Sequence, residues 1–100
     1  MKLIDNLFVA ENVLNPEAVV YSLQKDIPII RLYCIVLFTD KNRLEILSSK
    51  ELFTEKYRGR QGEIIGIAMG REEAVSLLLY MAEEATAHGR NAGDPRELII

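Results

Sequence analysis

The spacing of the hydrophobic positions changes from strand-like to helix-like at one clear point in the second half of the chain. The run 64–69 is apolar, is bounded by glycines and is too short for a helix, so it predicts a strand that is buried on both faces. Gly66 within this run predicts a close approach by a neighbouring element, because its missing side chain leaves room there. A helical pattern begins at about Arg71, and we expect the fold to be organised around this strand–helix unit.

The helix after this strand is apolar over an unusually wide face. Its buried stripe is predicted to consist of Ala74, Val75, Leu77, Leu78, Met81, Ala82 and Ala85. Leu79 and Tyr80 widen the apolar surface beyond the third of the circumference that usually faces a core. We therefore expect this helix to be covered on a second side by another copy of the chain. Leu77, Leu79 and Tyr80 are the predicted residues of that dimer interface.

Polar residues and glycines mark the ends of the same helix. Gly70 is a permissive N-cap, and Glu72 and Glu73 in the first turn complement the partial positive charge of a helix start. His88 followed by Gly89 predicts the end of the helix, because a cation and then a residue free to adopt positive φ suit a C-terminus.

The first half of the chain predicts a helix and then an antiparallel hairpin. Asn15 and Pro16 are typical of a helix start, and Pro28 requires the helix to end shortly before it. The apolar run 29–38 predicts the central strand of a sheet. After a polar turn, the run 44–47 predicts the strand that pairs with it.

Three further segments are shorter or less well defined. Ser48 and Glu51 have capping-box spacing and predict a short helix that ends at about Tyr57. The first ten residues fit a strand or a helix equally well, and both alternatives stay open. The apolar end 98–100 predicts an edge strand or a contact with a partner.

Together these elements predict an α+β fold that forms a single domain over residues 1–100. The expected architecture is a two-layer sandwich with helices packed on one face of a mixed or mainly antiparallel sheet of roughly three to five strands. A three-layer arrangement is disfavoured, because the central strands form a hairpin and not a crossover.

Composition narrows the functional classes. With 49% hydrophobic residues the chain is a folded domain, and such an apolar small chain often completes its core by self-association. The net charge of −3 gives no basic footprint for nucleic acid or an anionic membrane. A single cysteine excludes an internal disulfide, and no run is long enough to cross a bilayer or resembles a secretion signal, so we expect a cytoplasmic protein.

The segment 56–62 is the first candidate binding site. Lys56, Arg58 and Arg60 form a basic loop in which glycines would let backbone N–H groups approach an anion, and we expect these side chains to project into solvent. The tetrad 59–62 resembles the GXXG loop of KH domains, which clamps a nucleic-acid backbone. That resemblance implies a helix after the loop, whereas the run 64–69 predicts a strand, so we expect no nucleic-acid partner.

The other candidate residues have structural explanations. Arg71 lies at a strand–helix junction that could bind a phosphate, but Glu72 and Glu73 already occupy this helix start electrostatically and GXGXXG is absent. Cys34 lies in the most apolar stretch, which predicts a buried and inert thiol. His88 is the one histidine, which excludes multi-histidine metal sites, so we expect no metal and no cofactor.

The leading hypothesis is a non-enzymatic protein-interaction module that forms a homodimer, with an unknown protein partner. The alternative is a protein that binds a small anionic ligand, such as a nucleotide or phosphorylated metabolite, through Lys56, Arg58, Arg60 and Arg71. An enzyme would have to use carboxylates such as Asp40 or Glu63, whose spacing indicates no role.

Overall fold

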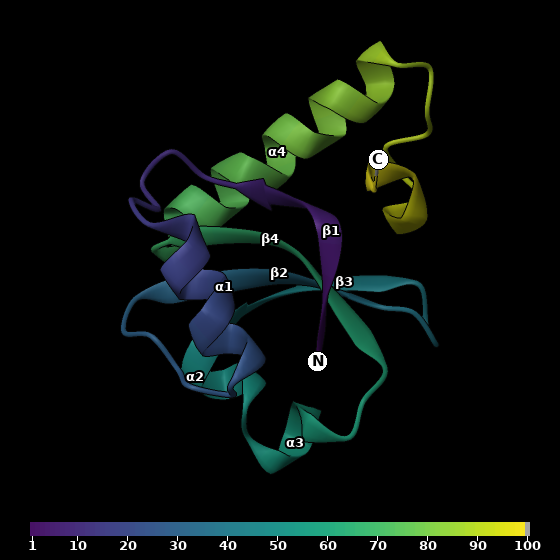
Figure 1. Cartoon of the computed structure of the whole chain (residues 1–100). Coiled ribbons are helices and arrows are strands. Elements are labelled where there is room, and N and C mark those ends of the chain that lie inside the picture. Colours follow the sequence, from purple (N-terminus) through teal and green to yellow (C-terminus); the bar gives the residue numbers. More distant parts are fainter. Residues whose placement is uncertain (100) are drawn as a thin grey trace.

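A four-stranded mixed sheet with helices on both faces forms the protein, in a computed structural model that describes residues 1–99 (Figure 1). The elements in chain order are β1 (Lys2–Val9), α1 (Pro16–Gln24), β2 (Leu32–Phe38), β3 (Arg43–Ser48), α2 (Ser49–Leu52), α3 (Glu55–Arg58), β4 (Gly62–Met69), α4 (Arg71–Ala87) and the 3-10 helix η1 (Pro95–Leu98). The strands lie in the order β1-β4-β2-β3, with β4 parallel to β1 and antiparallel to β2. The predicted α+β class, the mixed sheet and the β2–β3 hairpin are confirmed.

The helices cover both faces of the sheet, in contrast to the expectation that all of them share one face. Alternate side chains of β2 enter two separate cores. Val36 packs in the same core as Leu23 of α1, whereas Ile35 packs in the same core as Leu77 of α4. Figure 1 shows α4 on one side of the strands and α2 and α3 on the other. The physical reason is that β2 and β4 are apolar on both faces, so each face requires its own cover.

Gly66 lies at the contact between the sheet and α4. Relative to β2, strand β4 carries one extra residue at Ile65, so a bulge directly precedes this glycine. A Cβ atom on Gly66 would lie 3.1 Å from Cδ1 of Ile35 and 3.2 Å from Cδ2 of Leu77. The close approach predicted at Gly66 is confirmed, because α4 seats Leu77 in the space that the glycine leaves.

Two polar side chains fasten loops to the core, and the sequence patterns did not indicate either of them. The Asn12 amide donates to the Met69 carbonyl at 2.7 Å and accepts from the Met69 N–H at 3.1 Å. The buried Ser49 hydroxyl accepts from the Ile29 N–H at 2.8 Å and donates to the Ile29 carbonyl at 2.7 Å. Each side chain therefore satisfies both backbone groups of one residue, as a neighbouring strand would.

Hydrogen bonds confirm several of the predicted helix ends, but the single short helix predicted to end at about Tyr57 is divided into α2 and α3. The Asn15 side chain accepts a backbone N–H of α1, and Ser48 and Glu51 form the reciprocal capping box. Gly89 has a φ of 74°, and the next N–H, that of Arg90, donates to the carbonyl of Ala85 at 2.8 Å. This arrangement is a Schellman motif, which ends α4 where the sequence places its end.

The structure confirms one alternative at the start of the chain and contradicts the strand predicted at its end. The first ten residues contain an edge strand, β1, which settles the choice that the sequence left open. The predicted edge strand at the other end is wrong for its first part, because Leu98 ends a 3-10 helix and is buried against α4. Ile100, the last residue of that prediction, lies outside the described residues.

A hydrogen bond of 2.9 Å from the Asn42 amide to the Asp94 carboxylate ties the start of η1 to the turn between β2 and β3. This bond lowers the pKa of Asp94, and the backbone N–H of Arg96 acts in the same direction. The C-terminal segment is therefore positioned by a polar contact that no local pattern specifies.

Truncation of a buried residue of α4 should weaken the fold far more than truncation of an exposed one. Met81 is 1% exposed in the core between α4 and the sheet, whereas Val75 on the same helix is 40% exposed. Met81→Ala should lower the free energy of unfolding by about 2–5 kcal/mol through lost burial and a cavity. Val75→Ala should change it by less than about 0.5 kcal/mol. Urea unfolding followed by circular dichroism measures both, and equal losses would contradict this orientation of the helix.

Candidate functional site

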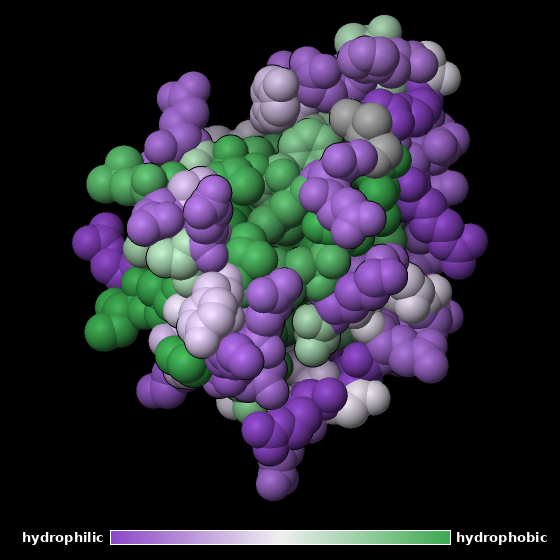
Figure 2. Space-filling model, viewed as in Figure 1, coloured by the Kyte–Doolittle hydropathy of each residue, from purple (hydrophilic) through white to green (hydrophobic). Residues whose placement is uncertain are grey.

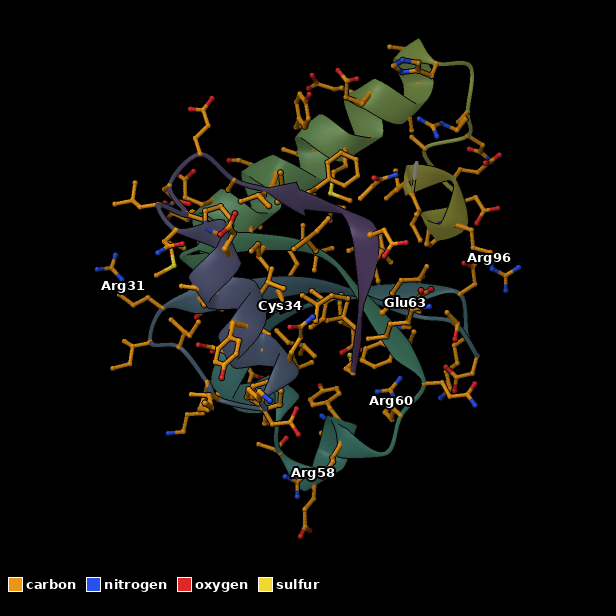
Figure 3. The ribbon with its side chains drawn as sticks, viewed as in Figure 1. Arg31, Cys34, Arg58, Arg60, Glu63 and Arg96 are labelled. Carbon is orange, nitrogen blue, oxygen red and sulfur yellow. The ribbon has the colours of Figure 1, made fainter. Side chains whose placement is uncertain are left out.

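The four cations predicted to bind an anion lie in two separate regions. Lys56 and Arg58 belong to α3 and Arg60 follows it, whereas Arg71 begins α4 beyond the far end of β4. The eight residues of β4 span roughly 23 Å at the usual rise of a strand. Figure 3 shows Arg58 directed away from the body of the molecule and Arg60 directed back towards it. The structure therefore brings together at most the three cations of the segment 56–62.

Arg60 contributes to the core, contrary to the expectation that it projects into solvent. Its guanidinium carbon lies 3.9 Å from the centroid of the Phe38 ring and 5.6 Å from that of Tyr57. One guanidinium nitrogen lies 3.6 Å from a carboxylate oxygen of Glu45. Lys56 also lies over the Tyr57 ring, at 5.2 Å, although it is exposed, as is Arg58. These contacts explain the basic loop as a cover over Phe38 and Tyr57.

The outer face of α4 carries apolar side chains among polar ones, and its apolar part is narrower than the sequence predicts. Leu77 is 8% exposed and faces the sheet, which removes it from the predicted interface. Leu79 and Tyr80 are 60% and 52% exposed, and Val75 lies on the same outward side. The direction of each side chain depends on how the helix is rotated on the sheet, and the Gly66–Leu77 contact fixes that rotation.

Two of the hollows that border the edge strand β1 lie beside the helices α1 and α4, and the sequence patterns did not indicate either of them. The larger, of about 850 Å³, is an open groove between β1 and α1. Its lining consists of Asp5, Asn6, Leu7, Phe8, Val9, Pro16, Glu17, Val20, Tyr21 and Gln24. The second, of about 430 Å³, lies between the end of β1 and α4 and is lined by Val9, Ala10, Glu11, Glu73, Ser76, Leu77 and Tyr80. In the view of Figure 2, apolar side chains gather in the hollowed centre of the molecule, and hydrophilic side chains surround them.

The remaining candidates for chemistry have structural roles. Cys34 is fully buried, and burial raises the pKa of its thiol to about 12. The exposed His88 ring places Nδ1 2.8 Å from the Glu84 carbonyl at the end of α4. Asp40 lies exposed in a turn, and the half-buried Glu63 borders a small hollow of about 260 Å³.

Within residues 1–99, no group of three or more His, Cys, Asp or Glu side chains is arranged to hold a metal ion. In the same part of the chain, no helix has the length and apolar character needed to cross a membrane.

Arg60→Gln should destabilise the protein, whereas Arg58→Gln should not. Loss of the guanidinium uncovers the Phe38 ring and removes a cation–π contact, so we expect a decrease of about 1–2 kcal/mol in the free energy of unfolding. Arg58 is exposed, and its substitution should cost less than about 0.5 kcal/mol. Chemical denaturation measures both variants. Similar stability of the two variants would show that the stacking of Arg60 on Phe38 does not contribute to the free energy of unfolding.

Cys34 should react with thiol reagents only when the chain unfolds. Because its pKa is raised above the ordinary 9.0 to about 12, the folded state favours the protonated thiol. The stabilisation that this shift represents is present below pH 9.0 and is lost as the pH rises towards 12. Labelling with a maleimide at neutral pH should therefore be slow and should accelerate in denaturant to the rate of a free thiol. Rapid labelling of the folded protein would contradict this burial.

Comparison with known proteins gives no family for this chain. No family model matches it, and no curated protein or solved structure matches it. The surfaces of the molecule with the most apolar character around a hollow are the outer face of α4 and the groove beside β1.

Proposed function

We propose that this protein is a non-enzymatic, cytoplasmic protein-interaction module that forms a homodimer through the outer face of α4. The observation that carries this proposal is the exposure of Leu79, at 60%, next to the half-exposed Tyr80 and Val75 on one side of the helix. Neighbouring exposed apolar side chains of this size are typical of an interaction surface. The absence of disulfides, which follows from the single Cys34, is compatible with a reducing compartment.

A two-fold symmetric interface requires a self-complementary surface, and the outer face of α4 offers both a protruding side chain and a hollow. Beside the protruding Leu79 lies an open, mainly apolar hollow of about 430 Å³, lined by Leu79, Ala82, Glu83, Thr86 and Ala87. In an antiparallel arrangement of two α4 helices, Leu79 of one protomer would enter the hollow beside Ala82 of its partner. Each copy would supply both a protruding Leu79 and a hollow that receives the Leu79 of its partner.

The helix dipole also favours an antiparallel pair, because the positive N-terminal end of one α4 then lies beside the negative C-terminal end of its partner. The alternative function, binding of a small anion at the segment 56–62, has weaker support because Arg60 is already engaged with Phe38 and Glu45.

A charge on the outer face of α4 should convert the dimer into a monomer. We expect the wild-type protein to sediment as a dimer at micromolar concentration, and Leu79→Glu to sediment as a monomer, because it would bury an unpaired carboxylate at the interface. Leu14→Glu is the matched control, since Leu14 is 93% exposed in the loop before α1 and its substitution should leave the dimer intact. Analytical ultracentrifugation provides the readout.

Two results would contradict the proposal. One is a monomeric wild-type protein up to about 100 µM, a concentration at which even a weak dimer of about −6 kcal/mol would be evident. The other is an unchanged dimer in Leu79→Glu, which would place self-association on a different surface. Thermal unfolding checks that both variants remain folded.

A further inference from the structure

The edge strand β1 has a backbone that can accept another strand. It is the outermost strand of the sheet, and in the described chain no strand lies on its other side. Just beyond β1, the Ala10 N–H donates inward to the Ile67 carbonyl at 3.0 Å. Because backbone groups of successive residues point to opposite sides of a strand, this bond directs those of Leu7 and Val9 outward.

The two hollows beside β1 match the side-chain alternation of an added strand. Leu7 and Val9 pack on the α1 side of the sheet, whereas Phe8 packs on the α4 side. The groove towards α1 and the hollow towards α4 therefore lie on opposite faces of one edge. A strand paired with β1 would send alternate side chains into these two spaces.

Both hollows combine apolar surface with acidic rims. Asp5 and Glu17 line the groove, and Glu11 and Glu73 line the hollow towards α4. Neither set of lining residues includes a lysine, arginine or histidine. Lys25 is one cation beside the groove, with its ammonium group 5.6 Å from the Tyr21 ring centroid. The four carboxylates of the two rims outnumber it, so an occupant that carries cations complements both sides of the edge.

We propose that β1 is a docking site for an extended peptide segment of a partner protein, in which apolar residues are interspersed with lysine or arginine. The segment extends the sheet by pairing with Leu7 and Val9 and places alternate side chains against Tyr21 of α1 and Tyr80 of α4. This site is separate from the self-association proposed for the outer face of α4, although Tyr80 borders both.

A second copy of the chain is a poorer occupant of the same edge. The pairing of β1 with β4 is irregular between Leu3 and Phe8, and Figure 1 shows β1 sharply bent, so only a short part of the strand is straight. Bends of this kind hinder long edge-to-edge pairing. Two copies would also bring the acidic residues Asp5, Glu11 and Glu17 of each chain towards one another, which repels at close range.

Selection from a displayed library of random octapeptides, followed by fluorescence anisotropy with the best binder, tests this proposal. We expect enrichment of sequences in which apolar residues recur at every second position with lysine or arginine between or beside them. On binding, the amides of Leu7 and Val9 should exchange more slowly with deuterium, because they become hydrogen-bonded. The affinity should fall as salt is raised from about 50 to 500 mM.

Substitutions in the protein and backbone changes in the peptide then distinguish strand pairing with β1 from nonspecific hydrophobic binding. Tyr21→Ala, at an exposed position of the groove, should weaken binding by about tenfold or more, whereas Leu14→Ala outside it should not. Glu17→Lys should shift preference towards an analogue in which glutamate replaces the basic residues. N-methylation of alternate peptide nitrogens should abolish binding, because it removes the donors that pair with β1.

Four outcomes would overturn the proposal: no saturable binder up to about 1 mM, enrichment of helical spacing or of acidic sequences, undiminished binding of the N-methylated peptide, or equal losses in Tyr21→Ala and Leu14→Ala. A Tyr21→Ala variant that loses dimerisation while the protein binds no peptide would instead identify a second copy as the occupant. Leu79→Glu should bind the peptide as the wild type does, which keeps this result distinct from that of the self-association experiment.

Discussion

The contact between Gly66 and Leu77 is the constraint on which the arrangement of this protein depends. A bulge at Ile65 and the missing side chain at Gly66 create a space in the face of β4, and Leu77 fills it so closely that a Cβ atom on Gly66 would require its neighbours to shift. Interiors are packed so closely that this contact determines the rotation of α4 about its axis. It therefore decides that Met81 enters the core and that Leu79 remains outside.

The second constraint is that the central strands are apolar on both faces. A sheet of this kind must be covered twice, and the long helix α4 covers one face while the short helices α1 to α3 share the other. The short helices contribute little apolar surface, so side-chain hydrogen bonds from Asn12 and Ser49 complete the attachment of their loops. The Arg60 guanidinium closes the remaining gap over Phe38.

These packing solutions leave two surfaces with surplus apolar character. One is the outer face of α4, which cannot contact the sheet once Leu77 does. The other is the edge of β1, where α1 touches the strand without covering it and an open groove remains. Carboxylates border both surfaces, in line with the negative net charge.

The sequence by itself determined the local elements, because each depends on neighbours in the chain. The capping box at Ser48 and the end of α4 at Gly89 follow from hydrogen bonds that span a few residues. The glycine-bounded strand follows from a local apolar run, and the α+β class follows from the order of the elements. Only the tertiary structure decided which face each helix covers, that Leu77 is buried and that Arg60 stacks on Phe38. It alone placed Arg71 far from the basic loop and β1 beside α1, because these relations join residues distant in the chain and depend on strand order and on the rotation of each helix.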